Sequence, residues 1–182
     1  MSADRKKIVV IGGGNGSSVA LRGLKSYDVD LTAVVTMFDS GGSTGILRDE
    51  FGYPPLGDIR QCLVALSPEE NERVAAFNSA LDFRFDSSSS LQGHSVGNLV
   101  LAALTTVYQG VQGAIDEMSR MMQLQGEVLP VTLDEAHLCA KLIDGQVIRT
   151  ESAIDLRGGN GPGIDHIFLD ADVEANPRAL DA

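Results

Sequence analysis

Residues 7–17 constrain the fold of this chain more than any other stretch. They read Lys-Ile-Val-Val-Ile-Gly-Gly-Gly-Asn-Gly-Ser, a β-branched run that stops at a cluster of glycines. Valine and isoleucine favour a strand buried on both faces, and glycines remove the Cβ atoms that keep a ligand from the backbone. The pattern predicts a parallel strand over 7–11, a tight turn, and a helix over 17–25 whose first N–H groups face the turn. Ser17 or Ser18 is expected to cap that helix.

This turn is typical of phosphate binding, but it is not a complete dinucleotide fingerprint. Gly12 and Gly14 match the first two glycines of a G-x-G-x-x-G motif, and Ser17 stands where the third would be. The residues that we expect to contact a phosphate are Gly12, Gly13, Gly14, Asn15, Gly16 and Ser17. A tight strand-to-helix turn that binds nothing is the alternative, so the turn needs support from elsewhere in the chain.

Apolar runs farther along predict an α/β fold with a Rossmann-like, doubly wound, mostly parallel sheet. Leu31–Met37 is the second strand, which completes a β-α-β unit. A β-hairpin insertion is expected where residues 137–143 and 146–150 meet at Asp144-Gly145. The other expected elements are helices over 58–67, 68–81, 96–107 and 111–125 and strands over 127–133 and 167–169. We expect a single nucleotide-binding α/β domain over residues 1–182.

Capping residues predict where the helices begin and end. Asp58 and Ser95 are expected to cap the helices that follow them, and Pro68 is expected to open another. Gly126 is expected to end the helix before it. Asn176 and the proline after it begin a last helix, and the chain stops a few residues later. We therefore expect a chain that lacks its C-terminal part.

Composition argues against several classes of partner and site. The chain has 182 residues and a formal net charge of −11, which disfavours nonspecific binding to nucleic acid or to an anionic membrane. No apolar run is long enough to span a membrane and no secretory signal precedes the first strand, so we expect a cytoplasmic protein. Cys62 and Cys139 lack metal-ligand spacing, and His137 and His166 are isolated, so a zinc site is not expected.

Two further segments place glycine and hydroxyl residues at a strand end or a helix start. Residues 39–45 follow the second strand, and residues 93–98 lead into a helix. In a doubly wound sheet, the turn after the first strand and the turn over residues 39–45 lie side by side at the carboxyl edge, where ligands bind. The residues that we expect here at a nucleotide site are Asp39, Ser40, Gly41, Gly42, Ser43, Arg48, His94, Ser95 and Asn98. A surface loop without a ligand is the alternative for residues 39–45.

Asp39 and two arginines each allow more than one role. Asp39 could accept hydrogen bonds from a ribose, hold Mg²⁺ beside phosphates, or cap its own glycine turn. Arg48 and Arg60 could clamp a phosphate or form structural ion pairs. No acid is placed to orient His94 toward Ser95, so a catalytic nucleophile is not expected. If the protein is an enzyme, Asp39 is the candidate catalytic residue.

Taken together, four blocks resemble the gluconeogenesis factor family. They are GGGNGSS, VVTMFDSGGSTGILRDEFGYPPLGDIRQCLVALS, FRF followed by GHSVGNLVLAAL, and GEVLPVTLDE. That family belongs to the same superfamily as 2-phospho-L-lactate transferase, an enzyme of deazaflavin coenzyme synthesis. The resemblance extends from Ile8 over nearly the whole chain and implies a Rossmann-like, cytosolic bacterial protein that binds a nucleotide sugar. UDP-N-acetylglucosamine is the ligand that it implies, with a role in gluconeogenic growth, cell shape and wall synthesis.

By position, the resemblance implies that the binding residues are the first turn, Asp39 with its loop, the GHSxGN block and Asn176. Three positions depart from the family pattern: Asn15 stands where threonine is frequent, Ser40 where a second aspartate is frequent, and Ile46 where arginine is frequent. The missing second acid weakens the expectation of Mg²⁺ at Asp39. The family pattern also continues past residue 182, so part of the pocket is expected to be missing.

The sequence therefore predicts a regulatory protein that binds a nucleotide sugar. A Mg²⁺-dependent phosphotransferase that uses a GDP-linked donor is the main alternative, and an NAD-dependent oxidoreductase is the weaker one. A homo-oligomer is compatible with each of them.

Overall fold

The computed structural model describes residues 5–41, 45, 47–48, 52–86, 91–159 and 161–182. Its main layer is a parallel sheet of three strands in the order β1-β2-β3. These strands are β1 (Lys6–Gly12), β2 (Val29–Val35) and β3 (Glu127–Pro130). The register pairs Ile8 with Leu31 and Ala33 with Val128. The predicted β-α-β start is confirmed, and β3 is shorter than the predicted strand over 127–133.

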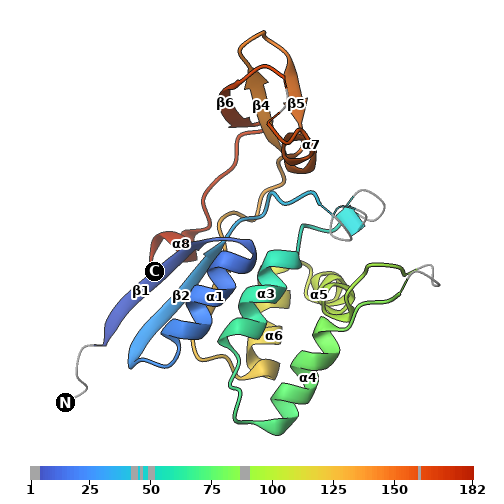
Figure 1. The fold of residues 1–182 in the computed structure, drawn as a ribbon. Coiled ribbons are helices and arrows are strands. Elements are labelled where there is room, and N and C mark those ends of the chain that lie inside the picture. Colours follow the sequence, from blue (N-terminus) through green and yellow to red (C-terminus); the bar gives the residue numbers. More distant parts are fainter. Residues whose placement is uncertain (1–4, 42–44, 46, 49–51, 87–90, 160) are drawn as a thin grey trace.

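Among the described residues, five helices build the layer that packs on this sheet (Figure 1). They are α1 (Gly14–Leu24), α3 (Gly57–Leu66), α4 (Glu72–Asp82), α5 (Val96–Val107) and α6 (Val111–Met122). Helices α1 and α3 lie side by side over the sheet, and α5 packs against α4 and α6. Val10 and Leu31 point into this layer, where Leu63 and Ile115 are fully buried. In the described part of the chain, no helix is long and apolar enough to cross a membrane.

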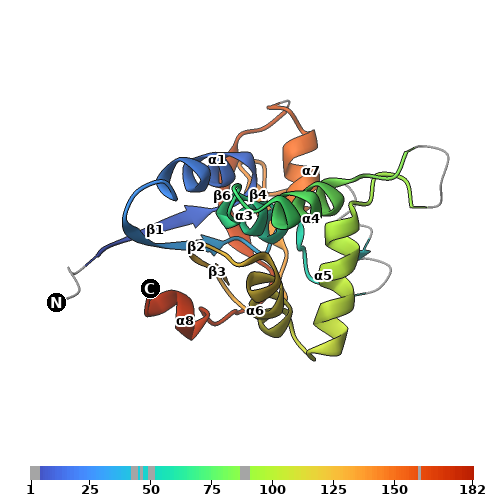
Figure 2. The same cartoon turned by 90° about the horizontal axis from the view of Figure 1, so that it is seen from below.

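The opposite face of the sheet is more open. Alternation along β1 turns Val9 and Ile11 away from the helical layer, and Ile11 is 77% exposed. Helix α8 (Pro177–Leu180) lies on this side and contacts β3 (Figure 2). Within the described ranges, β1 pairs with β2 only, so its other edge is open. The mostly parallel α/β sheet is confirmed, with most of its described helices on one face. The expectation that the first strand is buried on both faces is wrong, because the face of β1 that carries Val9 and Ile11 is exposed.

A second, antiparallel sheet stands beyond the carboxyl ends of β1 and β2 (Figure 1). Its strands, in the order β5-β4-β6, and the helix after β5 are β4 (Leu138–Leu142), β5 (Val147–Arg149), α7 (Glu151–Leu156) and β6 (Ile164–Leu169). The hairpin insertion is confirmed, since the Gly145 N–H donates to the Leu142 carbonyl at the predicted turn. Helix α7 was not predicted, and β6 begins before the predicted strand over 167–169.

Two predicted caps are confirmed. The Ser95 hydroxyl oxygen accepts a hydrogen bond from the Asn98 N–H at 3.2 Å, at the start of α5. The Asn176 side-chain oxygen accepts one from the Arg178 N–H at 3.1 Å, at the start of α8. Both caps need only residues that are close in sequence, so the local pattern was enough to predict them.

The start of α1 differs from the prediction. This helix begins at Gly14, and Gly13 is its N-cap. Ser17 and Ser18 lie inside the helix, where the Ser18 hydroxyl donates to the Asn15 carbonyl at 2.9 Å. The predicted serine cap is therefore wrong, because the glycines themselves form the first turn of the helix.

Two other helix boundaries are displaced. Helix α4 begins after Asn71, whose side-chain oxygen accepts hydrogen bonds from two N–H groups of the first turn, so Pro68 lies outside it. Helix α6 ends before Gln123, which adopts a left-handed conformation with a φ of 54°. Gly126 was expected at that end and instead leads into β3. Asn71 caps α4 later in the chain than Pro68, and Gln123 ends α6 earlier than Gly126.

Candidate functional site

The first glycine turn lies at the carboxyl end of β1, and a side chain of α3 fills the space in front of it. Asp58 was predicted to cap α3, but Leu56 is the N-cap and Asp58 lies in the first turn. A Cβ atom added to Gly13 would overlap Asp58 Oδ2 and would lie 2.5 Å from Thr36 Cγ2. Only glycine fits there. The Asp58 carboxylate is consequently held against the start of α1.

The Asp58 carboxylate is both repelled and stabilised in this position. Burial raises its pKa above the usual range, and the negative charges of Asp39 and Glu151 raise the pKa further. A hydrogen bond from the Gly14 N–H and the charge of Arg60 lower the pKa. The carboxyl group of Asp58 therefore already occupies the N-terminus of α1, the place where a phosphate is favoured.

The second turn, after β2, is joined to helix α7. The Gly41 N–H donates to Asp39 Oδ1 at 2.8 Å, so Asp39 caps its own turn. The Ser40 hydroxyl accepts a hydrogen bond from the Ser152 N–H at 2.8 Å, and the Ser40 N–H faces Glu151 Oε2 at 3.4 Å. Of the residues predicted in this turn, Gly42 and Ser43 lie outside the described residues. The first two turns are near enough for the charges of Asp39 and Glu151 to raise the pKa of Asp58.

The third segment adjoins this region through Arg60 of α3. Arg60 Nε donates to Asn98 Oδ1 at 3.2 Å, and Nη1 pairs with Asp82. The Arg60 side chain is 6% exposed, and burial lowers its pKa. Of the two roles open to Arg60, the structure shows the ion pair. His94 is also buried, and its Nδ1 has no hydrogen-bond partner among the residues that the structure describes.

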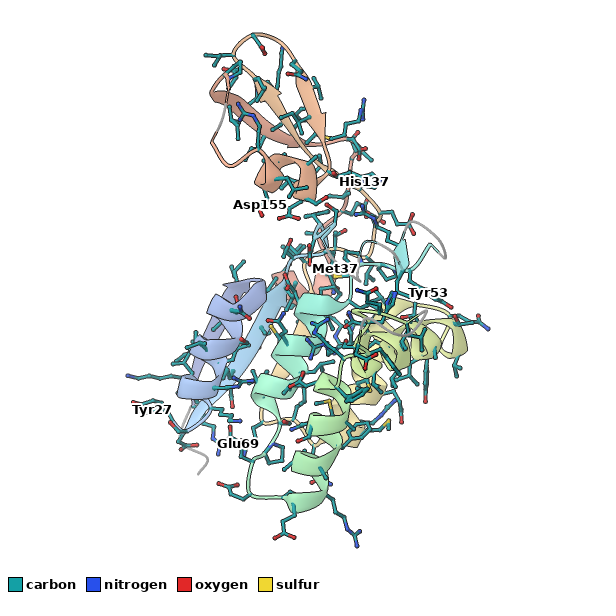
Figure 3. All side chains as sticks on the ribbon, turned by 45° about the vertical axis from the view of Figure 1, so that its right-hand side comes forward. Tyr27, Met37, Tyr53, Glu69, His137 and Asp155 are labelled. Carbon is teal, nitrogen blue, oxygen red and sulfur yellow. The ribbon has the colours of Figure 1, made fainter. Side chains whose placement is uncertain are left out.

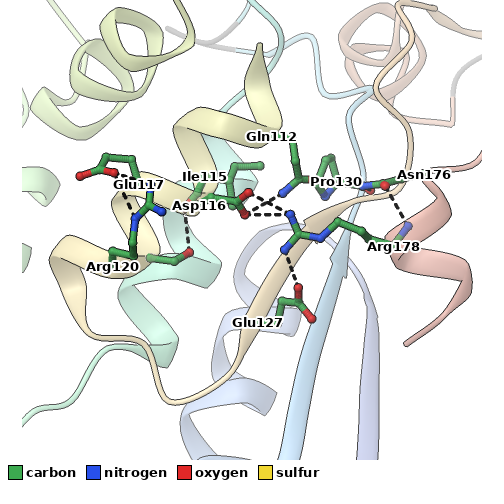
Figure 4. Close-up of polar contacts among 10 residues, drawn as sticks. Gln112, Ile115, Asp116, Glu117, Arg120, Glu127, Pro130, Asn176 and Arg178 are labelled. Carbon is green, nitrogen blue, oxygen red and sulfur yellow. Dashed lines mark hydrogen bonds and ion pairs between the residues drawn. The ribbon is translucent and has the colours of Figure 1, made fainter. Parts of the chain in front are cut away.

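Asn176 lies at the end of β3, where it holds α8 against the sheet (Figure 4). It is 3% exposed, and its side-chain nitrogen donates to the Pro130 carbonyl at 3.0 Å and to Gln112 Oε1 at 3.1 Å. Its side-chain oxygen caps α8. These contacts occupy both ends of the amide, and none of them involves the glycine turn. A role for Asn176 in ligand binding stays a prediction.

A cavity of about 750 Å³ lies between the helical layer and the small sheet. Met37 and Tyr53 line it from one side and His137 from the other (Figure 3). Arg48 also lines it, whereas the first glycine turn does not. Tyr53 and His137 were not predicted as site residues, because a Tyr-Pro-Pro turn and an isolated histidine carry no signal of a shared cavity. The segments that form it are brought together by the tertiary fold only.

A metal site has no support from the geometry of the described residues. They contain no group of three or more His, Cys, Asp or Glu residues arranged to hold a metal ion. Asp39 and Asp58 are near enough for one charge to affect the other, but Asp39 is used by its own turn and Asp58 by the start of α1. Magnesium at Asp39 stays a prediction.

Comparison with known proteins places these features in a family. The family model described as 2-phospho-L-lactate transferase CofD matches residues 8–182. The gluconeogenesis factor of Bacillus subtilis is 41% identical over 97% of this chain, and that of Halalkalibacterium halodurans is 42% identical over 91%. These alignments cover 54% and 49% of the two relatives, so the chain spans about half their length.

A solved structure agrees with the sequence comparison. The crystal structure of a protein from Bacillus halodurans superposes with a TM-score of 0.87 at 40% identity, and the match covers 97% of this chain and 55% of that one. The predicted resemblance to gluconeogenesis factors is confirmed, and the chain belongs to the 2-phospho-L-lactate transferase CofD family.

Proposed function

We propose that this chain carries the nucleotide-binding part of a regulatory protein whose ligand is a nucleotide sugar such as UDP-N-acetylglucosamine. The observation that carries the proposal is the start of α1, where Asp58 Oδ2 lies so close to Gly13 that no side chain would fit on that residue. Backbone N–H groups at such a position favour an anion. The diphosphate of the ligand would bind at this turn.

The rest of the ligand would extend toward the cavity. Met37 lines the cavity, and Asp39, two residues later, belongs to the turn that adjoins the diphosphate position. A volume of about 750 Å³ is of the size that small-molecule sites have. Tyr53 and Met37 offer apolar surface for a sugar or a base, and Arg48 also lines the cavity.

The proposed biological role follows the relatives. Two of them carry the name gluconeogenesis factor, which supports a role of this chain in growth on gluconeogenic carbon sources. Effects on cell shape and wall synthesis belong to the proposal only through the family resemblance of the sequence. We place such a regulator in the cytoplasm. Contacts with nucleic acid are not part of the proposal, because the formal net charge is −11.

A Mg²⁺-dependent phosphotransferase is the second candidate. The family model, which carries the name of a transferase, and the proximity of Asp39 to Asp58 favour it. This candidate uses a GDP-linked donor and a metal ion held by Asp39. It predicts GDP binding that requires Mg²⁺ and is lost in Asp39→Asn.

One binding panel separates the candidates. Calorimetry and thermal shift are measured with UDP-N-acetylglucosamine, GDP and NAD, each with and without Mg²⁺, and with the Bacillus subtilis relative as a full-length reference. Binding of the UDP-sugar without Mg²⁺ supports the regulator, and binding of GDP only with Mg²⁺ supports the transferase. If neither UDP-N-acetylglucosamine nor GDP binds this chain or the reference at millimolar concentration, both the regulator and the transferase proposals are wrong.

A further inference from the structure

We propose that Asp58 is a built-in competitor for the phosphate groups of the ligand, so that displacement of its carboxylate sets the affinity and the anion selectivity of the site. This inference rests on the proposed function and concerns the regulation of that same site. The competitor comes from α3, outside the three glycine segments.

Geometry places the carboxylate where a phosphate oxygen would bind. Asp58 Oδ2 lies over Gly13 so closely that an added Cβ would overlap it, and Oδ1 would be 3.9 Å from a Cβ on Gly14. The Gly14 N–H donates to this carboxylate. A phosphate that used the same N–H group would have to displace the carboxylate, because one donor at a helix N-terminus cannot serve two anions in full.

The charges around Asp58 do not neutralise an added phosphate. Asp39 from the second turn and Glu151 from α7 contribute negative charge at Asp58, and Arg60 contributes positive charge. Arg60 is held by Asp82 and by Asn98 at 3.2 Å, which directs its guanidinium toward α4 and α5. With Asp58 in place, an incoming diphosphate therefore meets three carboxylates and one arginine that is already paired.

A purely structural role makes the opposite prediction. If Asp58 only stabilises the starts of α1 and α3 as a carboxylate near two helix N-termini, its neutralisation weakens the fold and loosens the turn that binds the ligand. If Asp58 competes with the ligand, neutralisation leaves the turn intact and frees it. Asparagine keeps the size of the side chain and an oxygen that can accept the Gly14 N–H, so Asp58→Asn distinguishes the two roles.

The test compares Asp58→Asn with the unmodified chain and with Glu69→Gln. Glu69 is exposed and pairs with Lys25 at 2.9 Å, away from the glycine turn, so this control removes one charge from the molecule but none from the site. Dissociation constants are measured by calorimetry for UDP-N-acetylglucosamine and for pyrophosphate at two salt concentrations. Circular dichroism and thermal unfolding show whether each variant is folded, and Asp58→Ser is prepared in case Asp58→Asn is not.

The proposal predicts that Asp58→Asn binds both anions at least tenfold more tightly than the unmodified chain, with a smaller gain at high salt. Glu69→Gln stays within twofold. Equal or weaker binding of both anions by a folded Asp58 variant overturns the inference and leaves the nucleotide site in place. A gain for pyrophosphate without any binding of the UDP-sugar supports the competitor and refutes the proposed ligand.

Discussion

The close approach of helices α3 and α5 at Gly97 gives a prediction that can be worked out from distances. In Gly97→Ala, the new Cβ atom would lie 2.5 Å from Arg60 Cδ and 2.9 Å from the Leu81 carbonyl oxygen. Ordinary contact begins at 3.4 Å, so the overlaps are 3.4 − 2.5 = 0.9 Å and 3.4 − 2.9 = 0.5 Å. The Leu81 oxygen is backbone, and the Arg60 side chain is held by its ion pair to Asp82. Neither neighbour can move freely.

Two opposing terms decide the size of the effect. Overpacking of this kind costs about 1–3 kcal/mol, whereas alanine in place of glycine inside a helix contributes roughly 0.5–1 kcal/mol. We therefore expect Gly97→Ala to lower the free energy of unfolding by about 1 kcal/mol, and by no more than about 2.5 kcal/mol. For a chain of this length, the midpoint of thermal unfolding should fall by about 2–4 °C per kcal/mol.

A matched glycine provides the control for this experiment. Gly23 is exposed in α1, and an added Cβ there has no atom within 4 Å among the described residues. Gly23→Ala should leave the free energy of unfolding unchanged or raise it by up to about 1 kcal/mol, because only the preference of alanine over glycine in a helix remains. Urea unfolding of both variants is the assay. If Gly97→Ala is as stable as Gly23→Ala, the helices do not pack as closely as described and the reasoning is refuted.

Three further predictions follow from buried polar groups. The pKa of Asp58 is raised from its usual 3.8, so between 3.8 and the folded pKa this side chain is protonated more in the folded chain than in the unfolded one. Its contribution to stability should therefore fall as pH rises from 3.8 through the folded pKa. Urea unfolding should show this contribution in the unmodified chain and not in Asp58→Asn, and Asp58→Asn should be the more stable of the two at pH 7. Asn176→Ala should lose the α8 cap and leave the Pro130 carbonyl without its donor, so the free energy of unfolding should fall by about 2 kcal/mol and hydrogen exchange in α8 should become faster. The control Asn71→Ala removes only a helix cap, at a half-buried residue, and should lose about 1 kcal/mol. Burial raises the pKa of the Cys62 thiol to about 12, so iodoacetamide at pH 8 should modify it only at the rate of unfolding, and rapid modification of native protein would contradict its place in the core.

The sheet was predictable because its signals are local. The two β-branched runs predicted parallel strands, and β1 and β2 form in register from those runs, although Val9 and Ile11 of β1 are exposed. Ser95 and Asn176 cap helices through N–H groups two or three residues away, which the sequence displays directly. The Asp144-Gly145 pair predicted its hairpin for the same reason.

The arrangement of the site was less predictable because it depends on contacts between distant residues. Nothing near Gly13 indicates that Asp58, a whole helix and strand later, fills the space in front of it. The sequence allowed Arg60 either to bind a ligand or to form a structural ion pair. In the structure Arg60 forms an ion pair with Asp82 on α4, a residue that the sequence did not connect with it. The cavity combines Met37, Tyr53 and His137, whose patterns are unrelated in the sequence. Such features follow from the packing of complete elements.

The unpaired border of β1 bears on how the molecule behaves at high concentration. A free strand edge offers its amide and carbonyl groups to any neighbouring chain, and lysines are one way in which proteins discourage that pairing. Lys6 and Lys7 stand at the exposed start of β1, so their positive charges oppose those of a second copy that approaches this edge. The like charges repel at low ionic strength and are screened by added salt. Salt should therefore promote clustering of this chain through the rim that carries Ile11.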